Sequence, residues 1–268
     1  MTDAGSGARA LGAAEGGRPR RTAALPTAPG AVRSAGRDAV GVLHPGHRED
    51  DYRRLESLLG GSVRLSLART GGSAAAGRMA ALGEMGSADR LAAGVAELRR
   101  QGARAVLWAG TGPGFAFGWE GAHAQLRELA AAAGLPASST AFAFVHALRE
   151  LGATRVAVAT GCPGQVTGHI TAFLKAAGAE VVAAHHADAE PEGVWGRTEV
   201  LRLAGAVDHR RAQAVLLPDT ALPTAAWLGD LEAELGRPVL TASQVTVWEG
   251  LRLLDRRLGR PGLGALFG

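Results

Sequence analysis

Two side chains capable of acid–base chemistry follow apolar runs of the chain, where buried β-strands are expected to end. Asp219 stands just after the run 214–217, and Cys162 follows the run 155–159 and precedes Pro163-Gly164. A carboxyl group and a thiol can each donate or remove a proton, and a thiolate can also attack carbon. A helix is expected after Gly164, and its N-terminus should lower the pKa of Cys162. The two positions therefore predict proton-transfer or nucleophilic chemistry.

Each of the two side chains allows more than one interpretation. Asp219 could be a protonated acid, if an apolar pocket raised its pKa well above the ordinary value of about 3.9. It could instead be an ionised base, or it could simply cap a helix that follows Pro218. Cys162 is either a proton donor or nucleophile, or a small buried filler, since free cysteines are commonly inert core residues. Candidates for the apolar surroundings of Asp219 are Trp108, Phe115, Phe117 and Leu222.

The elements that position these residues alternate along the chain from residue 39 onward. Short apolar runs are separated by longer amphipathic stretches, the pattern of a mainly parallel sheet covered by helices. Strands are predicted at 40–43, 63–68, 105–108, 155–159, 180–183, 214–217 and 239–241. Helices are predicted at 89–101, 123–133, 166–177, 198–209, 225–235 and 245–258. The fold class predicted from this order is α/β.

An internal repeat relates the two halves of the chain. The segment Ala105-Val-Leu-Trp-Ala-Gly-Thr111 matches Ala214-Val-Leu-Leu-Pro-Asp-Thr220. The segment 134–136 matches 236–238 through a Gly-x-Pro pattern, and both are expected to lead through a short Ser/Thr-bearing strand into another helix. Upstream, 40–46 falls on 156–162. The repeat predicts two similar α/β subdomains related by an approximate twofold axis. Because ligands of such sheets bind beyond the carboxyl ends of the strands, the active site is expected in the cleft between the halves.

The repeat also divides the chain. Residues 1–38 carry no periodicity and six arginines, so they are expected to form a disordered basic extension. The first α/β half is expected over 39–150, the second over 151–260, and a C-terminal tail over 261–268. The cleft should be walled by residues near 44–47, 110–115, 160–164 and 218–222, which makes Pro45, His47, Gly161 and Thr220 candidate substrate-binding residues.

The paired strand ends and the run Leu151-Gly-Ala-Thr-Arg-Val-Ala-Val-Ala-Thr160 resemble the aspartate/glutamate racemase superfamily, and within it the branch of maleate isomerases and arylmalonate decarboxylases. In racemases of that superfamily, the resemblance implies one cysteine at each matched strand end. This chain has Gly110 at the first position and Asp219 at the second. Two-base racemisation by thiols is therefore disfavoured, and so is nucleophilic addition by a thiol at residue 110.

The resemblance favours decarboxylation. Arylmalonate decarboxylases also have Gly-Thr at the first strand end, and their chemistry requires donors that hold an enediolate and one proton donor. By resemblance, the Thr111 hydroxyl and the backbone N–H groups of Gly112, Cys162 and Ala221 would form that pocket, and Asp219 would replace the protonating thiol. The predicted function is a cofactor-independent enzyme acting on a small carboxylic or dicarboxylic acid. The alternatives are an isomerase of the maleate isomerase or racemase type without the usual cysteine pair, and a non-catalytic protein that binds small acids.

Composition and charge limit the classes of partner that the chain is expected to bind. The net charge of +4 reflects an arginine-rich chain, and the basic N-terminal residues lack the interleaved aromatic side chains of a nucleic-acid site. With a single cysteine and no long apolar stretch, the chain is expected to be cytoplasmic, with no disulfide, no membrane span and no partner nucleic acid. The Gly-rich turns lack a complete nucleotide fingerprint, so no cofactor is expected. No metal site is expected either; the expected ligand is a small carboxylic acid, and a homodimer is left open.

Overall fold

The computed structural model describes residues 38–46, 49–71, 87–187 and 195–268, all of which belong to the unit Arg37–Gly268. The predicted N-terminal extension lies outside the described residues except for Asp38. That residue already belongs to the first strand, where it pairs with Arg104 and, over 3.0 Å, with Arg256. His47 also lies outside the described residues.

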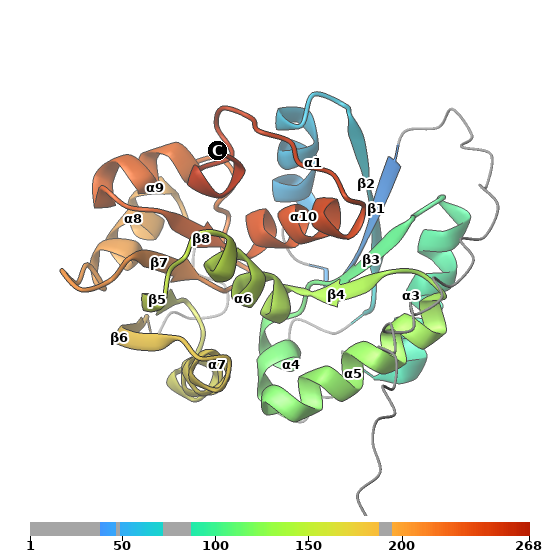
Figure 1. The fold of residues 1–268 in the computed structure, drawn as a ribbon, viewed down its shortest axis with the longest axis horizontal. Coiled ribbons are helices and arrows are strands. Elements are labelled where there is room, and N and C mark those ends of the chain that lie inside the picture. The colour runs from blue at the N-terminus through green and yellow to red at the C-terminus, as the bar shows by residue number, and fades with distance from the viewer. Residues whose placement is uncertain (1–37, 47–48, 72–86, 188–194) are drawn as a thin grey trace, which may run out of the picture. The chain divides into compact units, whose positions relative to one another are not determined.

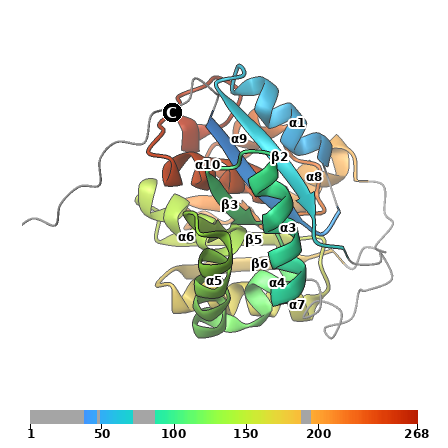
Figure 2. The same ribbon diagram turned by 90° about the vertical axis from the view of Figure 1, so that its right-hand side faces the viewer.

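The first half forms a four-stranded parallel sheet in the order β2-β1-β3-β4 (Figure 1). Its strands are β1 (Asp38–His44), β2 (Val63–Arg69), β3 (Ala105–Trp108) and β4 (Ala137–Ser139). The helices of this half are α1 (Glu49–Leu58), α3 (Ala88–Arg100), α4 (Thr111–Ala116), α5 (Gly118–Ala133) and α6 (Thr140–Glu150). Figure 2 shows α3 and α5 side by side over one face of this sheet.

The second half repeats this plan in the order β6-β5-β7-β8, again all parallel. Its strands are β5 (Arg155–Thr160), β6 (Glu180–His186), β7 (Ala214–Leu217) and β8 (Val239–Thr241). The helices are α7 (Gly164–Ala176), α8 (Arg197–Gly205), α9 (Leu228–Leu235) and α10 (Ala242–Leu253), followed by the short 3-10 helix η1 (Ala265–Phe267). The predicted α/β class with two similar halves is confirmed, since each strand has its counterpart in the other sheet.

The inner strands β3 and β7 are buried along their whole length, as is typical of apolar strands in a parallel sheet covered on both faces. Every residue of β3 and of β7 is buried. Since both strands are fixed by core packing on either side, the segments that leave their carboxyl ends start from rigid positions. These are the segments that carry Gly110 and Asp219.

The two halves interlock through their last helices. In Figure 1, α6 and α10 lie side by side at the centre, and α10 also packs on β1 and β3 of the first sheet. Gly250 permits this approach, because a Cβ atom there would lie 2.4 Å from Cγ1 of Val40. The predicted boundary at residue 150 therefore separates two sheets in sequence, but the final helix of the second half helps to build the core of the first.

A buried ionic cluster ties α6 to α10. Glu249 is fully buried, and its carboxylate lies 2.9 Å from Nδ1 of His146 and 2.7 Å from Nε of Arg252. Burial by itself would raise the pKa of Glu249, but the hydrogen bonds from Arg252 and His146 outweigh that effect and lower it to about 2. The carboxylate is therefore charged and holds the two helices together.

Several elements differ from those predicted. The helices α1 and α4 were not among those predicted by range. The repeat predicts a short strand and then a helix after 134–136, and β4 and α6 confirm this, although α6 is buried along most of its length and shows no helical stripe. Helix α9 begins at Leu228 rather than 225, α8 ends at Gly205 rather than 209, and α10 ends at Leu253 rather than 258. Among the described residues, no helix combines the length and hydropathy needed to cross a bilayer.

The C-terminal residues 261–268 pack on the second half. Leu263, Leu266 and Phe267 are buried, and the side-chain amide of Gln244 donates a 2.7 Å hydrogen bond to the Leu263 carbonyl oxygen. Glu232 accepts hydrogen bonds from the backbone N–H of Ala265. The expected tail is thus anchored to α9 and α10.

Candidate functional site

The carboxyl ends of β3 and β7 are joined directly by hydrogen bonds. The Thr111 hydroxyl donates to the Pro218 carbonyl oxygen over 2.6 Å and lies 3.1 Å from the Thr220 hydroxyl. The Thr220 backbone N–H donates to the Thr111 oxygen over 2.8 Å. Thr111 follows Gly110, and its partners flank Asp219, so the two strand ends matched by the repeat lie next to each other across the halves.

Asp219 and Cys162 form a pair at the ends of the neighbouring strands β7 and β5. The Cys162 thiol hydrogen-bonds to the Asp219 side chain. Asp219 is buried, its Oδ1 accepts a 2.8 Å hydrogen bond from the Ala221 backbone N–H, and its Oδ2 lies 3.2 Å from the point where a Cβ of Gly161 would stand. The fold therefore places a partly buried thiol and a buried carboxyl group together, with one carboxyl oxygen fixed by the backbone.

The expectation of a lowered pKa for Cys162 is wrong. Burial raises the pKa of the thiol well above its ordinary value, and the charge of Asp219 and the hydrogen bond to it act in the same direction. The helix N-terminus after Pro163 does not overcome these effects. At neutral pH the thiol keeps its proton, so Cys162 can donate a proton but is a poor nucleophile.

The alternative in which Asp219 caps a helix is also wrong. Turns follow Asp219, and α9 begins only at Leu228 with Trp227 as its N-cap. The carboxylate instead binds the N–H group two residues further on, as aspartate does in an Asx-turn. Of the apolar residues expected near Asp219, Trp108, Phe115 and Leu222 are buried, but Phe117 is 45% exposed.

Two of the four groups expected to hold an enediolate are engaged within the protein. The single hydroxyl hydrogen of Thr111 is directed at Pro218, and the N–H of Ala221 is directed at Asp219. Gly112 stands in the first turn of α4, where backbone N–H groups have no partner within the helix. Of the four expected donors, this leaves the N–H groups of Gly112 and Cys162 as candidates for the role.

Gly110 occupies a position where only glycine fits. Its φ of −125° and ψ of 104° are open to any residue. However, a Cβ atom would lie 2.4 Å from Cζ2 and 2.7 Å from Cε2 of Trp108, a ring that is 1% exposed and packed in the core. The indole thus fills the volume that a functional side chain at the first strand end would need.

Asp51 supports the site but was not predicted from the sequence. Its Oδ2 accepts hydrogen bonds from the backbone N–H groups of Thr224 (2.9 Å) and Ala225 (3.2 Å) and from the Ser243 hydroxyl (3.1 Å). A carboxylate on α1 of the first half therefore holds the segment that follows Asp219 in the second. Burial of Asp51 in the folded protein indicates this role. In the sequence, the run Glu49-Asp50-Asp51 is typical of the solvated first turn of a helix.

The end of β1 carries two of the residues expected to wall the cleft, His44 and Pro45. His44 is buried; its Nδ1 accepts a 3.2 Å hydrogen bond from the Gly46 backbone, and its Nε2 lies 3.7 Å from Glu49. Pro45 is partly buried in the following turn. Among the described residues, no group of three His, Cys, Asp or Glu side chains is arranged to hold a metal ion.

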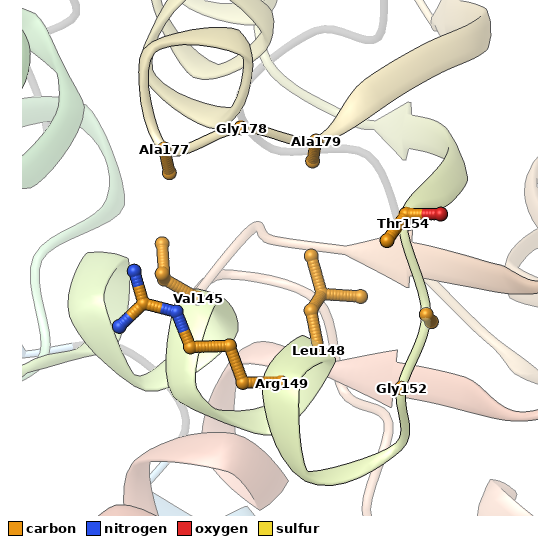
Figure 3. A pocket seen from close by; sticks show the side chains of 9 residues that line it. Val145, Leu148, Arg149, Gly152, Thr154, Ala177, Gly178 and Ala179 are labelled. Carbon is orange, nitrogen blue, oxygen red and sulfur yellow. The ribbon is translucent and has the colours of Figure 1, made fainter.

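A separate cavity lies at the opposite edge of the second sheet (Figure 3). It is formed by the end of α6, the turn 152–154 before β5 and the turn 177–179 before β6. Of its described lining residues, Arg149 is the only charged one, and Val145 and Leu148 provide apolar surface. The cavity adjoins the amino ends of the strands, so it is remote from the carboxyl ends that carry Cys162 and Asp219.

Comparison with known proteins gives consistent matches. The sequence model of the arylmalonate decarboxylase family matches residues 72–267. The maleate isomerase of Geobacillus stearothermophilus is 29% identical over 161 residues, which cover 58% of this chain and 63% of that protein. The arylmalonate decarboxylase of Bordetella bronchiseptica is 28% identical over 176 residues, 63% of this chain and 73% of that one. The alignment with the isomerase thus spans less than two thirds of its length.

Solved structures share the fold over nearly their whole length. A Nocardia farcinica maleate cis-trans isomerase with a covalently bound succinylcysteine intermediate matches with a TM-score of 0.77 at 22% identity, over 87% of this chain and 98% of that one. A crystal structure of arylmalonate decarboxylase matches with a TM-score of 0.69 at 23% identity, over 85% and 98%. Both similarities establish the architecture of two parallel sheets.

Proposed function

The chain belongs to the arylmalonate decarboxylase family, and on this basis we propose that it decarboxylates a small substituted malonate, with Cys162 as the proton donor and Asp219 as its partner. The observation that carries the proposal is the hydrogen-bonded thiol and carboxyl group at the joined strand ends. The family contains enzymes, and its relatives include both a decarboxylase and maleate isomerases.

The proposed reaction needs no cofactor. The bond between the α-carbon and one carboxylate breaks, carbon dioxide leaves, and the electron pair stays on the α-carbon as an enediolate with the remaining carboxylate. The thiol of Cys162 then gives its proton to the α-carbon, which yields the monocarboxylate and a thiolate. Water returns a proton to the thiolate and completes the cycle. Only one proton donor is required, in agreement with a glycine at the first strand end.

Asp219 keeps the proton donor, Cys162, in its protonated form. A thiolate beside a buried carboxylate is unfavourable, so Cys162 is reprotonated readily after each turnover. The N–H groups of Gly112 and Cys162 are proposed to hold the enediolate oxygens. In this proposal Thr111 and Thr220 have a positioning role, because their hydrogen bonds fix the distance between the two strand ends.

The same pair disfavours an isomerase that acts by covalent addition. The succinylcysteine in the Nocardia farcinica structure is a covalent cysteine adduct of that isomerase. Attack on carbon requires a thiolate, whereas here burial and Asp219 hold the thiol in its protonated form. Gly110 offers no second nucleophile.

The test is turnover of a panel of substituted malonates and of maleate in deuterated water. We expect a monocarboxylate that carries one deuterium at the α-carbon, and no fumarate from maleate. Replacing Cys162 with alanine should lower kcat by roughly 10²–10⁴-fold, the usual contribution of a general acid. Thr171→Ala, which truncates a partly exposed side chain on α7, should leave the rate unchanged.

Other outcomes would identify the alternatives. Fumarate formed from maleate by the wild-type chain would favour an isomerase. Binding of malonates in a thermal-shift assay without turnover or deuterium exchange would favour the non-catalytic acid-binding protein. Full activity in Cys162→Ala would remove Cys162 from the mechanism and leave Asp219 as the acid.

A further inference from the structure

The cavity at the junction of the two halves is remote from the strand ends that carry Cys162 and Asp219. It lies between the end of α6, which belongs to the first half, and the turns 152–154 and 177–179 of the second half. Its volume is about 300 Å³, which suits a small molecule. Because both halves line the cavity, a molecule bound there would contact both of them at once.

The cavity is apolar on two facing sides. In Figure 3, Val145 and Leu148 of α6 point across the cavity towards Ala177 and Ala179. Val145 and Leu148 are buried members of the main hydrophobic core, and the two alanines are partly buried against it. A short alkyl chain can therefore lie between the two sides, where removal of its surface from water favours binding.

Arg149 supplies the only charged group among the described residues that line the cavity. It stands one helical turn after Val145, and Figure 3 shows its guanidinium group beside that residue. Within the described part of the chain, this guanidinium group takes part in no ion pair or hydrogen bond. Since arginine binds carboxylates through two parallel N–H groups, a ligand with one carboxylate at its end complements this side chain.

The other donors of the described lining are engaged within the protein. The backbone N–H groups of 152–153 and 178–179 donate to carbonyl oxygens in the last turns of α6 and α7, over 2.9 to 3.2 Å. The N–H group and the hydroxyl of Thr154 both donate to Oε1 of Gln213, over 2.9 and 3.2 Å. A second carboxylate would therefore find no partner, and the partial negative charge at the ends of the two helices would repel it.

We propose that this cavity is a second ligand site, which binds a small monocarboxylate with an unbranched apolar tail of about five carbon atoms. The carboxylate pairs with Arg149, and the tail lies between α6 and the turn 177–179, so that the ligand links the two halves. Dianions such as the malonates proposed as substrates do not fit this site. The inference therefore does not depend on the proposed function.

The test is an NMR titration of the isotope-labelled full chain with valerate, pentanamide and glutarate. The amide signals of Gly152 and Gly178 report on the cavity, and that of Gly112 reports on the strand ends. We expect valerate to shift both cavity signals. Pentanamide, which has the same chain without the charge, should bind there about fivefold more weakly, as expected for loss of an exposed ion pair. Glutarate, with a carboxylate at each end, should bind more weakly still.

Three variants separate the contributions of charge and shape. Arg149→Gln should reduce the affinity of the cavity for valerate to that for pentanamide and leave pentanamide unchanged. Arg127→Gln is the matched control, since Arg127 is an exposed arginine on α5 outside the cavity, and it should change neither affinity. Ala179→Leu fills the cavity without a change in charge, so it should abolish the shifts caused by both probes.

Two results would overturn the inference directly: equal affinity of the wild type for valerate and pentanamide, or unchanged binding of valerate in Arg149→Gln. Valerate shifts confined to Gly112 would also overturn it, because acids would then bind at the strand ends and not in the cavity. If valerate shifts the cavity signals and depends on Arg149 while no malonate is turned over, this inference stands and the proposed function fails.

Discussion

The carboxyl ends of β3 and β7 occupy the same place in the same topology, yet they carry opposite features. At the end of β3, Trp108 covers Gly110 and excludes any side chain there. At the end of β7, the residue matched to Trp108 is Leu217, which is smaller, and a carboxyl group follows at Asp219. The two matched threonines, one from each end, lie 3.1 Å apart.

This difference shows how a duplicated fold divides its work. The first half provides shape and support: a filled strand end, the hydroxyl that binds Pro218, and the buried carboxylate of Asp51. The second half provides the groups that can exchange a proton, Cys162 and Asp219. The two halves share one backbone plan, whereas the thiol and the carboxyl group lie together in the second half.

The sharpest test of the comparison adds a carboxyl group at the end of β3 and removes the one at the end of β7. Gly110→Asp puts a carboxyl group at the first strand end, where the residue is the N-cap of α4 and aspartate would ordinarily be favoured. Because Cζ2 of Trp108 is 2.4 Å from the new Cβ, we expect a loss of more than about 3 kcal/mol in the free energy of unfolding. Asp219→Asn keeps the shape of the side chain. It should change the free energy of unfolding by less than about 1 kcal/mol and should lower activity.

Urea unfolding monitored by circular dichroism measures both variants. Gly168→Asp is the control, since a Cβ there meets open space on the exposed side of α7, and it should change the free energy of unfolding by about 1 kcal/mol or less in either direction. If Gly110→Asp were as stable as the wild type, the indole would not be the barrier and the contrast between the ends would fail.

The last helices of the two halves provide a second contrast. Glu249 stands eight residues after Thr241, the N-cap of α10, whereas the residue eight after the N-cap Ser139 of α6 is Ala147. Because folding lowers the pKa of Glu249 from 4.5 to about 2, its charge contributes about 3 kcal/mol of stability above pH 4.5. This contribution is lost as the pH falls from 4.5 towards 2.

We therefore expect Glu249→Gln to lower the free energy of unfolding by about 3 kcal/mol at pH 6 and by progressively less towards pH 3. The measurement is a series of urea melts between these pH values for the wild type and the variant. Glu150→Gln, on the exposed end of α6, serves as control and should change stability by less than about 0.5 kcal/mol. A difference independent of pH would mean that shape, not charge, stabilises the interface.

The sequence predicts the sheets well because periodicity and the repeat are local signals. The bounds of β3, β7 and β8 agree with the prediction. Helix α6 is indicated by the repeat and not by its own periodicity, because it is buried along most of its length and lacks the polar stripe that identifies a helix.

The site is only partly encoded locally. The repeat indicates Asp219, but the high pKa of Cys162 depends on a carboxylate from another strand, and no local motif reports it. Trp195 is likewise brought to Gly161 by tertiary packing, since the two residues are far apart in the sequence. Contacts of this kind become visible only in the folded structure.

The smallest expected effect concerns the support that the first half gives to the second. Asp51→Asn replaces a carboxylate oxygen, which accepts hydrogen bonds from two backbone N–H groups and a hydroxyl, with an amide that offers one acceptor and a donor. We expect a loss of about 2 kcal/mol in the free energy of unfolding, the typical value for charged hydrogen bonds. Since the segment held by Asp51 follows Asp219, kcat should also fall, by about tenfold.

Asp50 provides the matched control, because it is the neighbouring aspartate on α1 and is exposed. Asp50→Asn should change stability by less than about 0.5 kcal/mol and leave kcat unchanged. Urea melts and initial rates with a substituted malonate measure the two effects. If Asp51→Asn lost stability but kept full activity at a temperature where it is folded, Asp51 would hold the halves together without positioning the acid, and support for the site would have to come from Thr111 and Thr220 alone.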